Sequence, residues 1–204
     1  MWREAEARMD EVTAPPRLEP LADTRLNPRA AEAIEELRVV HDYPEGTEVH
    51  GFFATLNRSP ELLASFVQMG SDLSTETTLA PRLRELAILR TGWLCGAPYQ
   101  WGEHARAAMQ AGVTAEEVAR VREGSSAPEW SPADRTLLMA AEELHLRAAL
   151  SDQVWADLGA FLDERQMIEL LMLVGHYHTT AFVQNALRIP LNPGNDGLLS
   201  GLTP

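Results

Sequence analysis

The chain has 204 residues, of which 45% are hydrophobic, 23% charged and 6% aromatic. This length and composition favour one compact globular domain and exclude the disordered and fibrous classes. With 30 acidic and 17 basic side chains the formal net charge is −13, which leaves little basic surface to neutralise phosphates. We therefore expect no nucleic-acid partner.

The sequence carries no pattern for a membrane or an export route. No apolar run reaches the roughly 18 to 20 residues that cross a bilayer, and the start MWREAEARMDEV is acidic where a signal peptide has a basic end and an apolar stretch. We therefore expect a cytoplasmic protein without membrane contact. The single cysteine, Cys95, excludes a disulfide framework and a two-thiol redox centre within one chain.

The predicted organisation is one helical domain between two tails. Residues 1–28 are rich in proline and charge and lack a periodic apolar pattern, which predicts an extended arm. From residue 29 onward apolar residues recur at helical spacing, and no strand pattern is left over. We expect helices at roughly 29–40, 48–57, 60–74, 80–95, 98–111, 115–123, 132–148 and 152–186, the last broken near Leu162 and Asp163.

The predicted fold class is all-α: a single-domain bundle of about eight helices over residues 29–190, followed by a tail at 191–204. Helix starts carry capping chemistry, as at Ser131 before a proline and at Thr114 with Glu117 three residues on. The segments 83–95 and 167–175 are apolar on most of their circumference. Such helices are typical of a bundle centre, where several neighbours bury them.

The stretch from Arg84 to Val118 is the most informative for chemistry. It predicts a buried helix, a tight turn at 96–98 and a second helix running back along the first. Glu85 and His104 lie about ten residues before and about seven after that turn, so their heights along the hairpin differ by roughly 5 Å. Side chains reach this far across two packed helices, and a carboxylate beside an imidazole can exchange protons with a substrate.

This stretch resembles the carboxymuconolactone decarboxylase family, which includes the AhpD-like accessory proteins of alkyl hydroperoxide reductase. The resemblance lies in Glu85 early in the buried helix, the PYQW block at 98–101, His104 three residues beyond the tryptophan, and the continuation at 111–117. A more distant similarity extends over 57–191. The resemblance implies an all-helical, homo-oligomeric protein with pockets at or near subunit contacts.

The peroxidase branch of that family uses a CxxC pair at the start of the second helix. Laid on this chain, the two thiol positions fall on Ala97 and Gln100, and Cys95 lies two residues too early. A peroxidatic cycle of this kind needs an attacking thiolate and a resolving thiol. The chain keeps Glu85 and His104 but lacks the thiol pair. This combination indicates acid–base catalysis or ligand binding.

The decarboxylase branch, by resemblance, removes carbon dioxide from a carboxylated unsaturated lactone without a cofactor. This chemistry needs an electron sink in the substrate, a donor to the growing enolate and a proton source. The candidate catalytic residues are His104 as general acid, Glu85 as its orienting partner and Tyr99 as a donor. The candidate substrate-binding residues are Gln100 as a second donor, Trp101 and Trp93 as apolar walls, and Arg90 as a partner for a substrate carboxylate.

Each candidate also has a structural interpretation. Glu85 can form an ordinary ion pair with Arg82, and His104 can be a helix-face histidine without a function. The aromatic candidates can be packing residues, and Arg90 can pair with a structural acid. Cys95 is expected to be an inert, small hydrophobic residue.

The remaining histidines predict no site. His176 and His178 are two residues apart on a helix and point in different directions. With His145 as a third ligand a zinc site is conceivable, but buried, hydrogen-bonded histidines are the favoured interpretation and no metal is assigned. His41 and His50 flank a polar loop without a catalytic arrangement, although either could reach a neighbouring subunit's pocket.

We therefore predict a cofactor-independent lyase, a decarboxylase, or an isomerase that acts by Glu/His acid–base chemistry on a small unsaturated lactone or keto acid. Three alternatives stay open: a thiol peroxidase that uses Cys95 with an external thiol, a non-catalytic binding or assembly protein, and a natural-product tailoring enzyme with a larger substrate. The predicted partners are a small-molecule substrate and further copies of the chain, as a dimer, trimer or hexamer.

Overall fold

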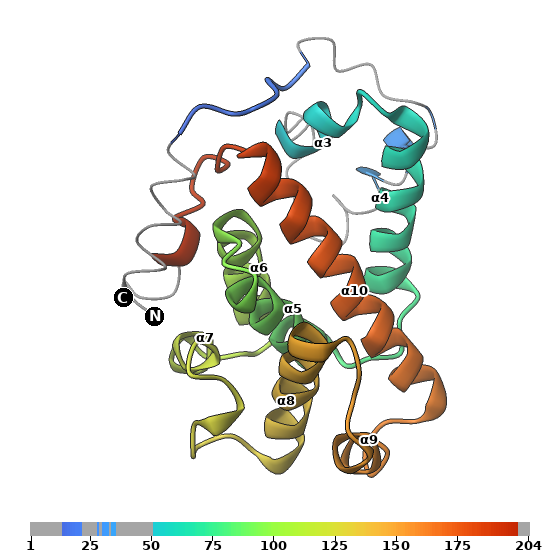
Figure 1. The fold of residues 1–204 in the computed structure, drawn as a ribbon, viewed down its shortest axis with the longest axis vertical. Coiled ribbons are helices and arrows are strands. Elements are labelled where there is room, and N and C mark those ends of the chain that lie inside the picture. Colours follow the sequence, from blue (N-terminus) through green and yellow to red (C-terminus); the bar gives the residue numbers. More distant parts are fainter. Residues whose placement is uncertain (1–13, 22–27, 29, 33, 36–50, 200–204) are drawn as a thin grey trace.

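A computed structural model describes residues 14–21, 28, 30–32, 34–35 and 51–199. In this part of the chain all regular structure is helical (Figure 1). The helices are α3 (Gly51–Leu56), α4 (Pro60–Thr75), α5 (Pro81–Leu94), α6 (Pro98–Gln110), α7 (Ala115–Val121), α8 (Pro132–Arg147), α9 (Asp152–Leu158) and α10 (Glu164–Leu187), with 3-10 turns η1 (Gly124–Ser126) and η2 (Gly197–Leu199). The predicted all-helical fold is confirmed.

The predicted helix bounds agree with the structure to within about two residues for most helices from residue 60 onward. The expected break near residue 162 separates α9 from α10, where Asp163 caps α10 in a capping box with Gln166. The Thr114 and Glu117 capping box at the start of α7 is also present. The first predicted helix is seen only at 30–32 and 34–35, and His41 and His50 lie outside the described residues.

Helix α5 lies at the centre of the bundle and packs against α6, α8 and α10. Every residue from Glu85 to Gly92 is buried, including the apolar run from Leu86 to Leu89. Figure 1 shows α10 running diagonally across the molecule, with α4 on one side and the α5 and α6 pair on the other. Because several helices surround α5, this short segment has no solvated face.

A Schellman motif turns the chain from α5 into α6. The Ala97 amide donates to the Gly92 carbonyl at 2.9 Å and the Gly96 amide donates to the Trp93 carbonyl at 3.0 Å. Gly96 has a φ of 54°, a left-handed value that glycine adopts without a steric penalty. This reversal makes the two helices antiparallel, so that the middle of α6 faces the first half of α5.

The described parts of both predicted tails lie against the bundle. Within residues 14–21, the Arg17 amide donates to the Leu187 carbonyl at 3.0 Å. After α10, the Asn195 side-chain amide donates to the Tyr99 carbonyl at 2.9 Å and to the Glu103 carboxylate at 2.8 Å. The segment 191–199 is thus fastened to α6. No helix among the described residues has both the length and the apolar character needed to cross a membrane.

Candidate active site at the α5 and α6 hairpin

Glu85 of α5 and His104 of α6 are in direct contact. The Glu85 Oε2 atom lies 2.8 Å from His104 Nδ1, and Glu85 is only 1% exposed. The antiparallel hairpin brings the two side chains within reach of each other, as their spacing from the turn predicts. The carboxylate accepts the Nδ1 proton and so orients the ring, with Nε2 on the side away from the carboxylate.

Arg84 supports the second oxygen of the same carboxylate. Its Nε atom lies 3.3 Å from Glu85 Oε1, and its guanidinium also donates to the Ser74 carbonyl of α4 at 3.1 Å. A buried carboxylate is tolerated when both oxygens have such partners. Arg82, the partner considered for Glu85 in the structural interpretation, instead binds Glu117 of α7 and Asp134 of α8.

Helix α10 supplies the aromatic surroundings of His104. The Tyr177 ring stands perpendicular to the His104 ring, with centroids 4.9 Å apart. The neighbouring His176 is buried and stacks on Phe66 at 4.5 Å. Burial, together with the nearby His104, lowers the pKa of His176 to about 4. The ring of His176 is therefore neutral at neutral pH, which leaves His104 as the candidate for proton exchange.

Gln100 lies one helical turn before His104 on the same face of α6. It is 2% exposed, and its Nε2 atom donates to the Ile88 carbonyl at 3.3 Å. A Cβ atom on Gly92 would come within 3.2 Å of this amide, so the glycine provides the room that it occupies. The Gln100 Oε1 atom is buried and accepts no hydrogen bond from the described residues. Such an atom is a natural acceptor for a ligand donor or a water molecule.

Tyr99 faces away from this pair. Its hydroxyl accepts a hydrogen bond from Asn192 at 2.7 Å, and its ring lies beside Phe52 with centroids 6.1 Å apart. It belongs to an apolar cluster that includes Ile189. Five residues separate Tyr99 from His104, which places them on different faces of α6.

The two predicted tryptophan walls form a structural cluster instead. The rings of Trp93 and Trp101 lie 5.3 Å apart, and the Arg122 guanidinium lies 5.4 and 5.1 Å from their respective centroids. Arg122 also donates to the Leu198 carbonyl at 3.1 Å. This cation–π arrangement ties the end of α7 to the hairpin.

Arg90 pairs with a structural acid, which was the alternative interpretation. Its guanidinium lies 2.9 Å from Glu142 of α8 and donates to the Val121 and Arg122 carbonyls at 2.9 and 3.1 Å. The partners engage the guanidinium from several sides in a buried position. It therefore clamps α5 to α8 and to the end of α7, and the structure gives no support to its predicted role at a substrate carboxylate.

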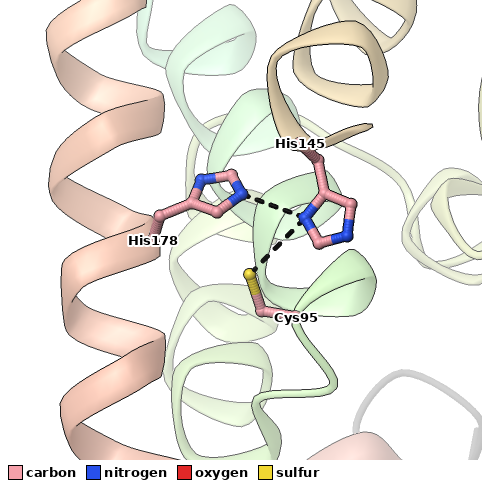
Figure 2. Close-up of side chains that lie close together, drawn as sticks. All are labelled: Cys95, His145 and His178. Atoms are coloured by element: carbon pink, nitrogen blue, oxygen red, sulfur yellow. Dashed lines mark hydrogen bonds between the residues drawn. The ribbon is translucent and has the colours of Figure 1, made fainter. Parts of the chain in front are cut away.

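A second cluster was missed by the sequence analysis (Figure 2). Cys95, His145 and His178 place one ligand atom each within 4.8 Å of one another. From the sequence, His145 and His178 were considered together with His176 as possible metal ligands. His176 instead contacts Phe66 and Tyr177. The third residue near His145 and His178 is Cys95. The separations of 50 and 33 residues from His145 leave no local pattern that would reveal this contact.

The match to a protein family covers the same hairpin. Residues 60–143 match the model of the Carboxymuconolactone decarboxylase family, a span that contains both Glu85 and His104. No curated protein matches the chain.

Three solved structures illustrate the shared fold. An alkylhydroperoxidase AhpD core protein, a peroxidase-related protein from Ralstonia eutropha, has a TM-score of 0.73 at 15% identity, over 94% of this chain and 100% of that chain. A peroxidase-related protein from a Silicibacter species has 0.71 at 17% identity, over 91% and 97%. The debrominase Bmp8 has 0.71 at 12% identity, over 91% and 97%.

These identities are low, so the solved structures establish the fold and nothing beyond it. The described residues form an all-helical domain with the AhpD-like fold. Its residues 60–143 match the model of the Carboxymuconolactone decarboxylase family, and the solved structures share the fold. The resemblance that the Glu85 to Glu117 region indicated is thereby confirmed.

Proposed function

We propose that the protein is an enzyme that works by acid–base chemistry, with His104 as the proton donor and Glu85 as its positioning residue. The observation that carries this proposal is the 2.8 Å contact between a buried carboxylate and the imidazole on the facing helix. A carboxylate on Nδ1 fixes the ring and compensates the positive charge when Nε2 takes a proton. Histidine is the side chain that most often moves protons in catalysis.

The proposed reaction is a lyase or isomerase step on a small unsaturated lactone or keto acid, without a cofactor. In a decarboxylation, the bond to the carboxylate carbon breaks, carbon dioxide leaves, and the electron pair moves into the substrate's unsaturated carbonyl system. The resulting dienolate then takes a proton from His104 Nε2, and solvent returns a proton to the ring. An isomerisation would use the same histidine to remove and return a proton.

Gln100 and Tyr177 are the residues that we propose as substrate contacts. The buried Gln100 Oε1 atom lies one helical turn from His104 and can accept a hydrogen bond from a substrate hydroxyl. Tyr177 offers a ring edge and a phenolic group on the α10 side. The remaining sequence candidates have packing and ion-pair partners elsewhere and are not part of this proposal: Tyr99, Trp93, Trp101 and Arg90.

Peroxidase chemistry at Cys95 is the less favoured alternative. Cys95 is the chain's single cysteine and is buried at the end of α5, so a resolving thiol would have to come from another molecule. The Bmp8 debrominase shares the fold, and its alanine variant in complex with 2,3,4-tribromopyrrole has a TM-score of 0.69 at 14% identity. A small unsaturated ring is thus among the ligands that this architecture accommodates in another protein.

We further propose a cytoplasmic protein that assembles into a homo-oligomer and takes a small molecule as its substrate. A tailoring enzyme with a larger substrate would use the same Glu85 and His104 pair, and a non-catalytic binding protein would keep the pair for structural reasons. Turnover measurements separate these alternatives.

The test incubates carboxymuconolactone and related lactones with the wild-type protein and with His104→Gln. It measures the release of carbon dioxide or the change in the substrate's ultraviolet absorbance. We expect the variant to lose about 100-fold or more of the rate, the usual contribution of a general acid. Arg106→Gln is the matched control, because Arg106 is on the same helix with a side chain 58% exposed, and it should react like the wild type.

Equal rates in wild type and His104→Gln would refute the role of His104. If no lactone or keto acid is consumed by the wild type while His104→Gln lowers the melting temperature, the pair is structural and the binding interpretation replaces the enzyme. Hydroperoxide consumption that Cys95→Ser abolishes would instead favour the peroxidase.

A further inference from the structure

Three potential metal ligands converge where three helices meet, away from the Glu85 and His104 pair. Cys95 is the C-cap residue of α5, His145 lies in the last turn of α8, and His178 lies in the second half of α10. Figure 2 shows the sulfur and the two rings pointing toward one another. Along α5, Cys95 is ten residues from Glu85, which corresponds to about 15 Å. The cluster is therefore separate from the candidate active site.

The His178 ring is held in the orientation that a metal ligand needs. Its Nδ1 atom lies 2.8 Å from the Val174 carbonyl, which can only accept, so Nδ1 carries the proton and Nε2 presents its lone pair. That lone pair faces His145 Nδ1 at 3.0 Å. Metal-bound histidines almost always donate their other ring N–H to a carbonyl or carboxylate in this way.

The spacing of the three ligand atoms is close to that around a tetrahedral zinc ion. Bond lengths of roughly 2.05 Å to nitrogen and 2.3 Å to sulfur place two nitrogens about 3.3 Å apart, and a nitrogen and a sulfur about 3.6 Å apart. The structure has 3.0 Å between the two nitrogens and 3.9 Å between Cys95 Sγ and His145 Nδ1. The third pair, Cys95 Sγ and His178 Nε2, lies within 4.8 Å, so rotation of these side chains by an ångström or less per atom would complete the geometry.

A cation can bind all three ligand atoms at once. With neutral groups, His145 Nδ1 either carries a proton and donates to His178, or lacks one and accepts from Cys95, but it cannot do both. A cation placed between them accepts a lone pair from each of the three atoms. The cation would replace the shared proton, which is how metal binding displaces protons from thiol and imidazole ligands.

The field of the helices also favours a cation here. The carboxyl end of α5 at Cys95 and the carboxyl end of α8 at His145 both direct partial negative charge toward the cluster. Reactive thiolates are instead found at helix amino ends or beside cations. The fold therefore disfavours an isolated nucleophilic thiolate at Cys95 and favours a metal-bound one.

The backbone around Cys95 is fixed as well. The Asn185 side-chain amide of α10 donates to the Cys95 carbonyl at 3.0 Å and to the Gly96 carbonyl at 3.2 Å. This contact holds the Schellman turn against the helix that carries His178. The sulfur and one imidazole are thus positioned relative to each other before any ligand arrives, which lowers the cost of binding.

We propose that Cys95, His145 and His178 form a binding site for a zinc ion. A thiolate and two imidazoles suit zinc, and three protein ligands leave the fourth position for water or another small ligand. Both imidazoles are partly exposed, so a cation and a water molecule can reach the site from solvent. The metal site would stand even if the acid–base function proposed for Glu85 and His104 failed.

The test uses the purified full-length chain, stripped with a chelator and titrated with Co²⁺ as a spectroscopic probe and then with Zn²⁺. We expect one Co²⁺ per chain, visible bands of tetrahedral cobalt, a near-ultraviolet thiolate-to-cobalt band, and displacement of cobalt by zinc. Cys95→Ser and His178→Gln should weaken binding by about 100-fold or more, at least the scale lost when the outer support of a ligand is removed. His104→Gln is the matched control and should bind cobalt like the wild type.

The thiolate band needs no variant, because Cys95 is the single cysteine and therefore the only possible source of the band. Its appearance would support the site even if Cys95→Ser failed to fold. Absence of the band at millimolar Co²⁺, or unchanged affinity in a folded Cys95→Ser protein, would overturn the proposal. Retention of copper without any binding of cobalt or zinc would overturn the assignment to zinc.

Discussion

At the level of single residues, the buried carboxylate of Glu85 is placed between two partners with different roles. The His104 Nδ1 atom lies 2.8 Å from one carboxylate oxygen, and the Arg84 Nε atom lies 3.3 Å from the other. The arginine compensates the charge of the carboxylate, and the imidazole is the partner that can exchange a proton. Loss of the charge at residue 85 therefore affects the proposed chemistry through His104.

We expect Glu85→Gln to lower kcat by about 10- to 100-fold while KM changes little, because the amide keeps the shape of the side chain but no longer compensates a protonated His104. Steady-state kinetics on whichever lactone the wild type consumes would measure this. A variant with unchanged kcat, or one that raises KM alone, would contradict the positioning role.

Two helical glycines form a matched pair for a stability test. A Cβ atom on Gly102 of α6 would lie 1.8 Å from Asn195 Oδ1, whereas a Cβ atom on Gly175 of α10 would meet nothing within 4 Å. The Asn195 side chain also binds the Tyr99 carbonyl, so it cannot move away without losing that contact. The same substitution should therefore have opposite effects at the two positions.

We expect Gly102→Ala to lower the free energy of unfolding by about 1 to 3 kcal/mol through overpacking. In the monomeric chain, Gly175→Ala should raise it by about 0.5 to 1 kcal/mol, since alanine costs less backbone entropy in a helix. Urea denaturation of both variants, at a protein concentration that keeps them in the same assembly state, measures the two signs. Stabilisation by Gly102→Ala would show that the segment after α10 does not hold its place on α6.

At the level of helices, one ion-pair network joins α5, α7 and α8. The Arg82 guanidinium donates to Glu117 of α7 at 2.7 and 2.8 Å and to Asp134 of α8 at 3.1 Å. The hydrogen bonds from Arg82 hold the pKa of Glu117 below its ordinary value. Because the native pKa is the lower one, this stabilisation is present above the pKa of the unfolded chain and is lost as the pH falls through the native value.

We expect Glu117→Gln to cost about 1 kcal/mol of unfolding free energy at pH 7, a modest amount because the pair is partly exposed. The glutamine keeps one acceptor oxygen for the Thr114 amide at the start of α7, but it loses the charge and one of the two acceptors that face Arg82. The difference from the wild type should shrink as the pH falls below about 4.5, where the carboxylate of the unfolded chain begins to take up protons, and should vanish below the lower pKa of the native state. Urea denaturation at several pH values checks this, with exposed Glu123→Gln as the control; a pH-independent difference would contradict the mechanism.

Across the molecule as a whole, α10 carries a stripe of exposed apolar side chains. Ile168, Met172 and Phe182 are 62%, 49% and 63% exposed, and with Gly175 and Thr179 they repeat at alternating intervals of four and three residues. This spacing keeps them on one face of the helix and is typical of helix pairing. The stripe is the surface that we assign to the proposed contact between copies of the chain.

We expect the wild type to be a homo-oligomer and the double variant Ile168→Glu, Met172→Glu to be a monomer, because charge on this face opposes its burial. Light scattering coupled to size-exclusion chromatography measures the mass of each. A control double variant at exposed polar positions on other helices, Gln110→Glu and Gln153→Glu, tests whether the added charge alone is sufficient. A wild-type monomer, or an oligomer unaffected by the apolar variant, would refute the assignment.

Sequence patterns were enough to predict the helices and the contact of Glu85 with His104. Both depend on interactions between near neighbours: apolar spacing, caps such as Thr114, and the arithmetic of an antiparallel hairpin closed by one tight turn. The apolar spacing, the capping residues and the number of residues from the turn can all be read from the sequence. Predictions based on them need no knowledge of how distant segments pack.

Helix packing in three dimensions was needed to establish which side chains of α5, α6 and α10 share a site. Tyr99 was expected beside His104, but its face of α6 is covered by the segment after α10. Arg90 was a candidate for substrate binding, but α8 brings Glu142 against it. Cys95 meets His145 and His178 because three helices pack together, and such contacts depend on the relative rotation and height of helices, which no local pattern encodes.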